Sequence, residues 1–420
     1  MLAGLAAASP ARAEIVAPTA SPALLAVARD GTPRVAFLSG RDLVLARRGT
    51  ANWSFTKLGR LPAGTPVLAG LVLDGRARAS VLVEGNGGRW LALANPGKKL
   101  RVVARPKAGR TFGPAGLTLD AAGRPAFAYA LQLRSAKTYL RLVTTDSRGR
   151  LRTHGITKGG FPSSSQVPGA APVLVRGRLH VVETYTSAAI DWGPKSGGGW
   201  EGQFLFASRI GTPAGRVGAA ASDGNLWSSW TQLSGDAINV LLTLSAGTQE
   251  TAIVVDHGIF VSLLLEAGRP EVGAYDWVEP AESSFSYVGV LADQNGPFTE
   301  LDGRLEGYAA APNGGRQLLL STASGLEWFQ TPSRPSIRVT VDADASRHVS
   351  GQVVGAGQGV VQIYRETSAG RTLAGTAELA ADGSFSFQDA APISPTFYRA
   401  VYVDAATNIP YASLLRTPVD

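Results

Sequence analysis

Aromatic and acidic residues gather in one segment of the chain. Residues 185–203 contain Asp191, Trp192, Trp200 and Glu201 around a run of three glycines. Flat indole rings stack on the face of a pyranose, and carboxylates accept hydrogen bonds from its hydroxyl groups. This segment therefore predicts a long loop that binds a sugar.

Further aromatic and acidic residues follow later in the chain. Tyr275, Asp276, Trp277 and Glu279 join the same site if their loops open on the same face, as do Trp227 and Trp230. For these last two tryptophans, packing between neighbouring sheets is the alternative. The predicted ligand-binding residues are Trp192, Trp200, Asp191, Glu201, Tyr275 and Trp277.

Paired carboxylates raise the possibility of glycoside hydrolysis. Asp191 with Glu201, or Asp276 with Glu279, form such pairs in the sequence. The chemistry depends on the separation of the two groups, about 5 Å for retention and about 6.5–9.5 Å for inversion. A chain with 32 acidic residues yields such pairs by chance. Binding is preferred, a carbohydrate-active enzyme is the alternative, and the catalytic residues are unknown.

The sequence excludes cysteine-based sites and lacks the motifs of histidine metal sites and phosphate loops. The chain has no cysteine, which excludes thiolate catalysis, disulfides and cysteine metal sites. His154, His180, His257 and His348 are scattered without metal-ligand spacing, and His180 reads as a strand residue. Glycine-rich stretches lack the lysine of a phosphate loop. We therefore expect neither a metal nor a cofactor.

A recurring turn between two apolar strands predicts how these residues are positioned. Its marker glycines are Gly31, Gly75, Gly123, Gly177, Gly224, Gly268 and Gly303. Their mean spacing of about 45 residues suits a four-stranded propeller blade. The sequence predicts an all-β, seven-bladed β-propeller, with six blades as the alternative because positions 268 and 303 are only 35 residues apart. A ring must close, so we expect residues 14–19, or the strand after them, to pair with the last repeat.

The pattern of strands and turns changes after the linker at residues 329–335. Short strands and turns then alternate at the spacing of a β-sandwich. Residues 349–351, 361–365, 381–387 and 397–402 resemble a bacterial Ig-like or fibronectin-like domain, which implies spacing, adhesion or docking. The predicted division is a signal-peptide remnant at 1–13, a propeller at 14–332 and an Ig-like sandwich at 333–420.

The repeats also resemble those of sialidase-type propellers, in which an apolar strand meets an Asp turn. The S-x-D-x-G-x-x-W box of that family is not intact here, because residues 222–224 are compressed relative to it. The Arg-Ile-Pro signature is missing as well. The resemblance is to a bacterial secreted propeller with degenerate repeats, and no catalytic residue is carried over.

The N-terminal segment and the charge balance suggest export and an anionic partner. Ala11, Arg12 and Ala13 end an apolar run in the pattern that signal peptidases accept, with Glu14 as the mature start. No apolar stretch is long enough for a membrane span. The formal charge is +8, with a dense basic run between Arg76 and Arg110 and a second at residues 148–152. Basic surfaces attract anions, and a solvated blade edge is the alternative interpretation.

We therefore predict a secreted or cell-surface protein that binds rather than catalyses. Its expected partner is an extracellular glycan, an anionic polymer or a protein, recognised by propeller loops. We expect no nucleic acid partner and a monomeric state. The alternatives are a carbohydrate-active enzyme and a structural spacer without a ligand.

Overall fold

The computed structural model describes residues 13–19, 22–85, 87–95, 98–107, 111–133, 137–157, 161–162, 168–185, 188–207, 212–234, 237–246, 248–266, 268–278, 286–312, 314–331, 334–342, 347–367, 370–390, 397–406 and 408–413. Strands β1 to β37 account for most of these residues, turns and irregular segments connect them, and no helix occurs among them. The all-β prediction is confirmed. The predicted signal-peptide remnant lies outside the described residues, apart from position 13.

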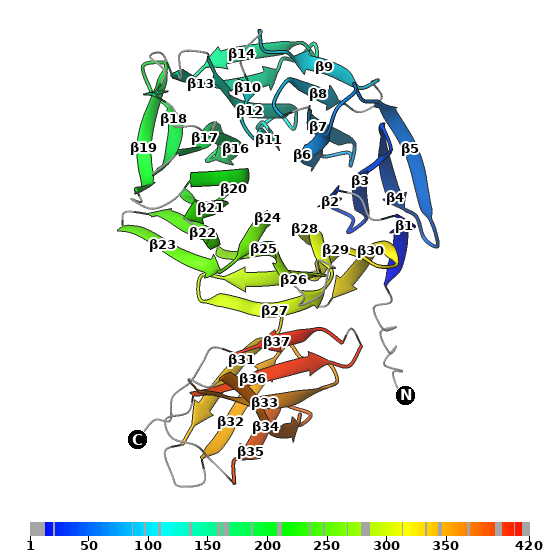
Figure 1. Cartoon of the computed structure of the whole chain (residues 1–420), viewed down its shortest axis with the longest axis vertical. Helices are drawn as coiled ribbons and strands as arrows, with labels where there is room; N and C mark the ends of the chain where they lie inside the picture. Colours follow the sequence, from blue (N-terminus) through cyan, green and yellow to red (C-terminus); the bar gives the residue numbers. More distant parts are fainter. Residues whose placement is uncertain are drawn as a thin grey trace, which may run out of the picture.

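The described residues between 14 and 331 form seven antiparallel sheets around a ring (Figure 1). Sheet I contains β2 (Ala23–Val27), β3 (Pro33–Ser39), β4 (Asp42–Arg48) and β5 (Trp53–Arg60). Sheet II contains β6 (Pro66–Leu73), β7 (Ala79–Gly85), β8 (Trp90–Ala94) and β9 (Arg101–Ala104). Sheet III contains β10 (Thr111–Phe112), β11 (Gly116–Leu119), β12 (Pro125–Gln132), β13 (Lys137–Thr145), β14 (Leu151–Gly155) and β15 (Phe161–Pro162).

The remaining sheets of the ring follow in chain order. Sheet IV contains β16 (Gly169–Val175), β17 (Arg178–Tyr185), β18 (Ala188–Pro194) and β19 (Trp200–Ala207). Sheet V contains β20 (Thr212–Ser222), β21 (Asn225–Ser234), β22 (Ala237–Ala246) and β23 (Thr248–Val255). Sheet VI contains β24 (Gly258–Glu266), β25 (Arg269–Val278), β26 (Ser286–Asp293) and β27 (Gly296–Asp302). Sheet VII contains β28 (Arg304–Ala310), β29 (Arg316–Thr322), β30 (Gly325–Thr331) and β1 (Glu14–Ala17).

The innermost strands of the ring are β2, β6, β11, β16, β20, β24 and β28 (Figure 1). Each of these inner strands contacts the inner strands of the two neighbouring sheets, and β28 contacts β2. The middle strands are continuous runs of buried, mostly apolar residues, as in β8 and β12, and successive side chains point to opposite faces, so each sheet buries both faces against its neighbours. Sheets I and II, for example, share a core that includes Leu43, Leu68, Val81 and Trp90. The ring is therefore closed by side-chain packing between sheets, as in a propeller.

The start of the chain supplies the outermost strand of the last sheet. β1 pairs antiparallel with β30, and Glu14 lies opposite Trp328. Val16 packs in a core with Leu326 and Trp328. Glu14 also forms a 2.6 Å ion pair with Arg48 of sheet I. The predicted pairing of residues 14–19 with the last repeat is confirmed.

The marker glycines are not all equivalent in the structure. Six of them lie between the inner and second strands of a sheet, but Gly303 joins β27 of sheet VI to β28 of sheet VII. The equivalent turn of sheet VII contains Gly314, whose N–H donates to the carbonyl of Ala311 and whose φ is 81°. Position 314 lies 46 residues after position 268, so the short last interval came from a marker out of phase with the others.

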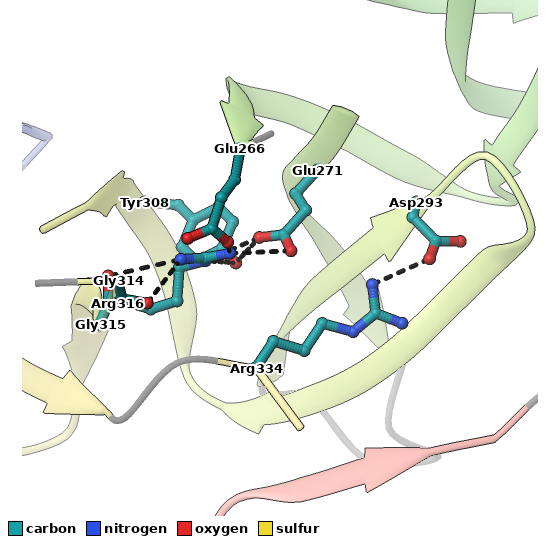
Figure 2. Close-up of polar contacts among 8 residues, drawn as sticks. All are labelled: Glu266, Glu271, Asp293, Tyr308, Gly314, Gly315, Arg316 and Arg334. Carbon is teal, nitrogen blue, oxygen red and sulfur yellow. Dashed lines mark hydrogen bonds and ion pairs between the residues drawn. The ribbon is translucent and has the colours of Figure 1, made fainter. Parts of the chain in front are cut away.

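A buried ion-pair network joins sheets VI and VII (Figure 2). Arg316 donates from Nε to Glu271 at 2.8 Å and from Nη1 to the carbonyl of Gly314 at 3.0 Å, and it also pairs with Glu266. Tyr308 donates its hydroxyl to Glu271 at 2.5 Å. Although burial opposes it, hydrogen bonding to Arg316 holds the pKa of Glu271 below its usual value. Each buried charge in this network therefore has a partner.

The C-terminal residues form a second body of two sheets. One contains β31 (Ser336–Val341), β32 (His348–Val354) and β35 (Ser384–Gln388). The other contains β33 (Gly359–Thr367), β34 (Gly370–Glu378), β36 (Phe397–Asp404) and β37 (Pro410–Ala412). Val349, Ile363 and Tyr398 belong to the core that both sheets share.

The C-terminal body docks on sheet VI beside β27 (Figure 1). Thr299 donates to the carbonyl of Pro410 at 2.7 Å. Arg334 pairs with Asp293 at 2.8 Å (Figure 2) and covers the ring of Phe298. The contact therefore combines polar and apolar components and lies at one point of the ring wall.

Ring closure by β1 can be tested with two neighbouring residues. Val16 is 3% exposed and Ile15 is 58% exposed, because they face opposite sides of the same strand. We expect Val16→Asp to lower the free energy of unfolding by roughly 3 kcal/mol or more, since it buries an unpaired charge. Ile15→Asp is the control and should leave it nearly unchanged in urea titrations. If both variants lost the same free energy of unfolding, β1 would not close the ring through one buried face.

Backbone conformation distinguishes the turn glycines. Gly123 has a φ of 71°, whereas Gly75 does not adopt a positive φ, and a Cβ on either would meet open space. We expect Gly123→Ala to cost about 1–2 kcal/mol, because a Cβ strains the left-handed conformation. Gly75→Ala should be neutral or slightly stabilising. Thermal unfolding of both variants measures the difference, and a larger loss for Gly75→Ala would refute this assignment.

Candidate functional site

The predicted loop at residues 185–203 is mostly strand, so the loop prediction is wrong. β18 and β19 pair across it, with Asp191 opposite Gln203 and Trp192 opposite Gly202. The glycine run supplies the tight turn between them, where Gly198 and Gly199 both have positive φ. The long 54-residue interval between positions 123 and 177 belongs to sheet III and gives this segment no extra length.

Strand alternation places the predicted tryptophans and acids on opposite faces of sheet IV. Trp192 and Trp200 are partly buried against a core between sheets III and IV that includes Leu140 and Val181. Trp192 also donates its indole N–H to Glu183 at 2.9 Å. Asp191 and Glu201 lie on the other face. The two rings and the two carboxylates therefore do not form one site.

The acids instead share a depression with a histidine on that other face. It has a volume of about 420 Å³ and is lined by His180, Asp191, Gly193, Pro194, Glu201, Gly202 and Gln203. His180 Nδ1 lies 3.0 Å from both carboxylate oxygens of Asp191. A Cβ on Gly193 would lie 2.8 Å from His180 Cε1, so a glycine leaves room for the imidazole there.

The exposure of these side chains indicates which of them can meet a ligand. The side chains of His180 and Asp191 are 19% and 12% exposed, and that of Glu201 is 72% exposed. A carboxylate only accepts hydrogen bonds, so His180 donates from Nδ1 and its Nε2 is left for a ligand. Together with Glu201 and Gln203, the depression offers acceptors and an amide donor. This set can hold the hydroxyl groups of a polar ligand.

The second predicted group lies elsewhere on the ring. Tyr275, in sheet VI, packs edge-to-face on Tyr287 and under the guanidinium of Arg304. Asp276 lines a separate depression of about 320 Å³ with Asp256 and Glu300. The side chain of Trp277 and all of Glu279 lie outside the described residues. Sheet V separates this group from the depression on sheet IV (Figure 1), so Tyr275 and Asp191 are not brought together.

Trp227 and Trp230 pack between neighbouring sheets, which was the alternative to a binding role. Both are buried, Trp227 in a core with Val272 and Trp230 in a core with Val182 and Leu205. They are therefore structural residues of the contacts on either side of sheet V.

His180 is the residue that sequence reasoning did not connect with the acids. A predicted β-hairpin between residues 178–185 and 188–194 would have connected them. In that hairpin Val181 pairs with Trp192, and this register places His180 opposite Gly193. Recognising it required knowing that residues 188–194 form a strand. The histidine is indeed a strand residue, as expected, but its ring also lines the depression.

Two carboxyl groups, the buried Glu183 and the half-buried Glu84, have strongly shifted pKa values. Burial raises the pKa of Glu183 to about 7, although the hydrogen bond from Trp192 opposes the shift. Burial likewise raises the pKa of Glu84 to about 7, against the backbone N–H of Ala115. Both groups lie inside the ring wall, so the shifts concern stability rather than ligand chemistry.

Comparisons with known proteins assign no family. No protein-family model matches the chain, and no curated protein is significantly similar to it. AofleA from Arthrobotrys oligospora is 12% identical over 70% of this chain and 93% of its own, with a TM-score of 0.42. A protein of unknown function from Dyadobacter fermentans is 12% identical over 67% and 99%, with a TM-score of 0.45. The Hadza microbial sialidase Hz136 is 11% identical over 73% and 74%, with a TM-score of 0.43. At these identities and scores, the likenesses identify no activity for this chain.

Two further classes of feature were searched in the described part of the chain. No three His, Cys, Asp or Glu side chains gather there in a group that could hold a metal ion. No helix there has the length and apolar character needed to cross a membrane.

The shifted carboxyls predict how stability depends on pH. Between the ordinary glutamate pKa of 4.5 and the folded value of about 7, the folded state holds more protons than the unfolded state. The free energy of unfolding should therefore fall as pH rises through this window, by at most about 1.4 kcal/mol per pH unit for each group. We expect the double variant Glu84→Gln with Glu183→Gln to flatten this slope in urea titrations from pH 5 to 8. Glu201→Gln, an exposed control, should retain it, and an unchanged slope in the double variant would rule out this origin.

Proposed function

We propose that this chain is an exported, non-catalytic binding protein that recognises an extracellular glycan. The depression on sheet IV is the proposed binding site. The observation that carries the proposal is the convergence of the hydrogen-bonded His180–Asp191 pair with Glu201 and Gln203. Side chains held by one another lose little freedom when a ligand binds, which favours recognition of a polar ligand.

The ligand class follows from the chemistry of the lining. Imidazole, carboxylate and amide groups together accept and donate hydrogen bonds, as neighbouring sugar hydroxyls require. The open form of the depression suits the end or side of a chain better than a fully enclosed small molecule. Trp192 and Trp200 contribute by fixing β18 and β19 from the opposite face rather than by stacking on sugar.

We further propose that residues 14–332 form a seven-bladed β-propeller and that residues 333–420 form an Ig-like domain. The seven sheets with contacting inner strands support the first assignment. The two sheets around one core support the second. A secreted or cell-surface, monomeric adhesion protein is the setting that we propose for this architecture, with the second domain as the spacing or docking element.

A glycan array followed by calorimetry tests the binding site. We expect His180→Ala, Asp191→Asn and Gln203→Ala each to weaken binding of the identified glycan by about tenfold or more, because each removes a hydrogen-bonding group. Asp256→Asn in the depression between sheets V and VI is the matched control and should bind normally. Undiminished binding in all three site variants would refute the assignment.

A carbohydrate-active enzyme is the second candidate. The observation that favours it is the pairing of Asp191 with His180 beside the exposed carboxylate of Glu201, since acid and base groups at one site can catalyse glycoside hydrolysis. A panel of chromogenic glycosides separates the two functions. Turnover that is lost in Asp191→Asn or Glu201→Gln would replace the binding proposal with an enzymatic one.

A further inference from the structure

Several basic residues lie in turns at one end of sheets II and III. In a four-stranded antiparallel sheet, the first and third turns lie at the same end. In sheet II these turns join β6 to β7 and β8 to β9, and the corresponding turns of sheet III join β11 to β12 and β13 to β14. A Cβ on Gly149 of sheet III would lie 3.2 Å from Lys98 Nζ of sheet II. The basic turns of the two sheets therefore meet.

Three arginines of these turns are held by the chain itself. In each case an aspartate accepts the side chain of the arginine four residues later: Arg78 to Asp74, Arg124 to Asp120 and Arg150 to Asp146. The same carboxylates accept the backbone N–H groups of those arginines. Arg152 adds a longer contact to Asp146 at 3.6 Å. These arginines are structural parts of the turns.

Other basic residues in these turns or directly after them have no such side-chain partner among the residues that the structure describes. Arg76 and Arg148 donate only their backbone N–H groups to Asp74 and Asp146, at 2.9 Å each. Their guanidinium groups are exposed, as are the side chains of Lys98, Lys99 and Arg101. Within the described residues, none of these five side chains forms an ion pair. We call Arg76, Lys98, Lys99, Arg101 and Arg148 the basic rim.

We propose that the basic rim is a second binding site, separate from the depression on sheet IV, and that it takes an acidic polysaccharide. Five exposed cations spread across two neighbouring sheets match repeated anionic groups along an extended chain better than one compact anion. The aspartates do not cancel this charge, because each already binds an arginine of its own turn.

The composition of the rim favours a polysaccharide over a single-stranded nucleic acid. Single strands are held mainly by bases stacked on aromatic side chains beside a basic groove. Residues 74–78, 98–101 and 146–150 contain no aromatic residue. Carboxylate or sulfate groups on a sugar chain need only the cations and their hydrogen bonds.

Affinity for defined polymers at several salt concentrations tests the rim. The probes are heparin for sulfate groups, polygalacturonate for carboxylates, and dextran as the uncharged polymer. We expect one or both acidic polymers to bind the full-length chain, with an affinity that falls steeply as salt rises, and dextran not to bind through the rim. The triple variant Arg76→Gln, Lys98→Gln and Arg148→Gln should weaken binding at least tenfold and make the salt dependence shallower.

A control with the same loss of charge separates a site from general attraction. Arg178, Arg269 and Arg338 are exposed basic residues of other sheets, and their combined change to glutamine also removes three positive charges. This control should bind acidic polymers as tightly as the unmodified chain does. Both triple variants should have the same melting temperature as the unmodified chain. Equal weakening in the two variants, or no binding of either acidic polymer, would overturn the proposal. Tighter, rim-dependent binding of duplex DNA at the same salt would also overturn it as an acidic-polysaccharide site.

Discussion

Pairing between the two ends of the ring is the constraint on which the rest of the structure depends. Each sheet buries apolar side chains on both faces, so an open row of sheets would leave two such faces exposed to water. Contact between β2 and β28 covers them, and β1 completes sheet VII from the beginning of the chain. Opening this contact would expose the core around Val35, Leu319 and Trp328. The basic turns of sheets II and III meet because these sheets are held side by side in the ring.

Buried polar groups add a different kind of constraint to the apolar contacts. Apolar faces built from leucine and valine are similar from sheet to sheet, so they do not fix how one sheet is positioned against the next. A buried charge needs its partner at one position. Arg316 meets two carboxylates and a backbone carbonyl across sheets VI and VII. Glu183 has the indole N–H of Trp192 as a donor but is otherwise desolvated, which is why its pKa rises instead of falling. The first group is stable as an ion pair, and the second is most stable when it is protonated.

The sequence predicted the ring because turn chemistry and strand alternation are local properties. It predicted the wrong marker at Gly303, since a glycine also occurs where one sheet connects to the next. It could not show that Ala77 takes the left-handed position in the turn of sheet II, where Asp74 accepts two backbone N–H groups. The predicted loop at residues 185–203 was wrong for a related reason. Neighbouring residues such as Asp191 and Trp192 point to opposite faces once their segment becomes a strand, and a glycine run between tryptophans does not reveal this.

The Asp turns show why counting charges along a sequence does not locate a charged surface. Arg76 and Arg78 are two residues apart and equivalent in any composition, yet Asp74 binds the side chain of Arg78 and only the backbone of Arg76. The geometry of the turn explains this difference. The carboxylate of Asp74 faces the side chain of Arg78, the residue that leads into the next strand, and meets only the backbone of Arg76. Hydrogen bonds from Arg78 then outweigh burial and lower the pKa of Asp74, so this pair keeps its charges down to acidic pH. The excess positive charge is thereby concentrated on the residue at the tip of the turn, where a ligand can reach it.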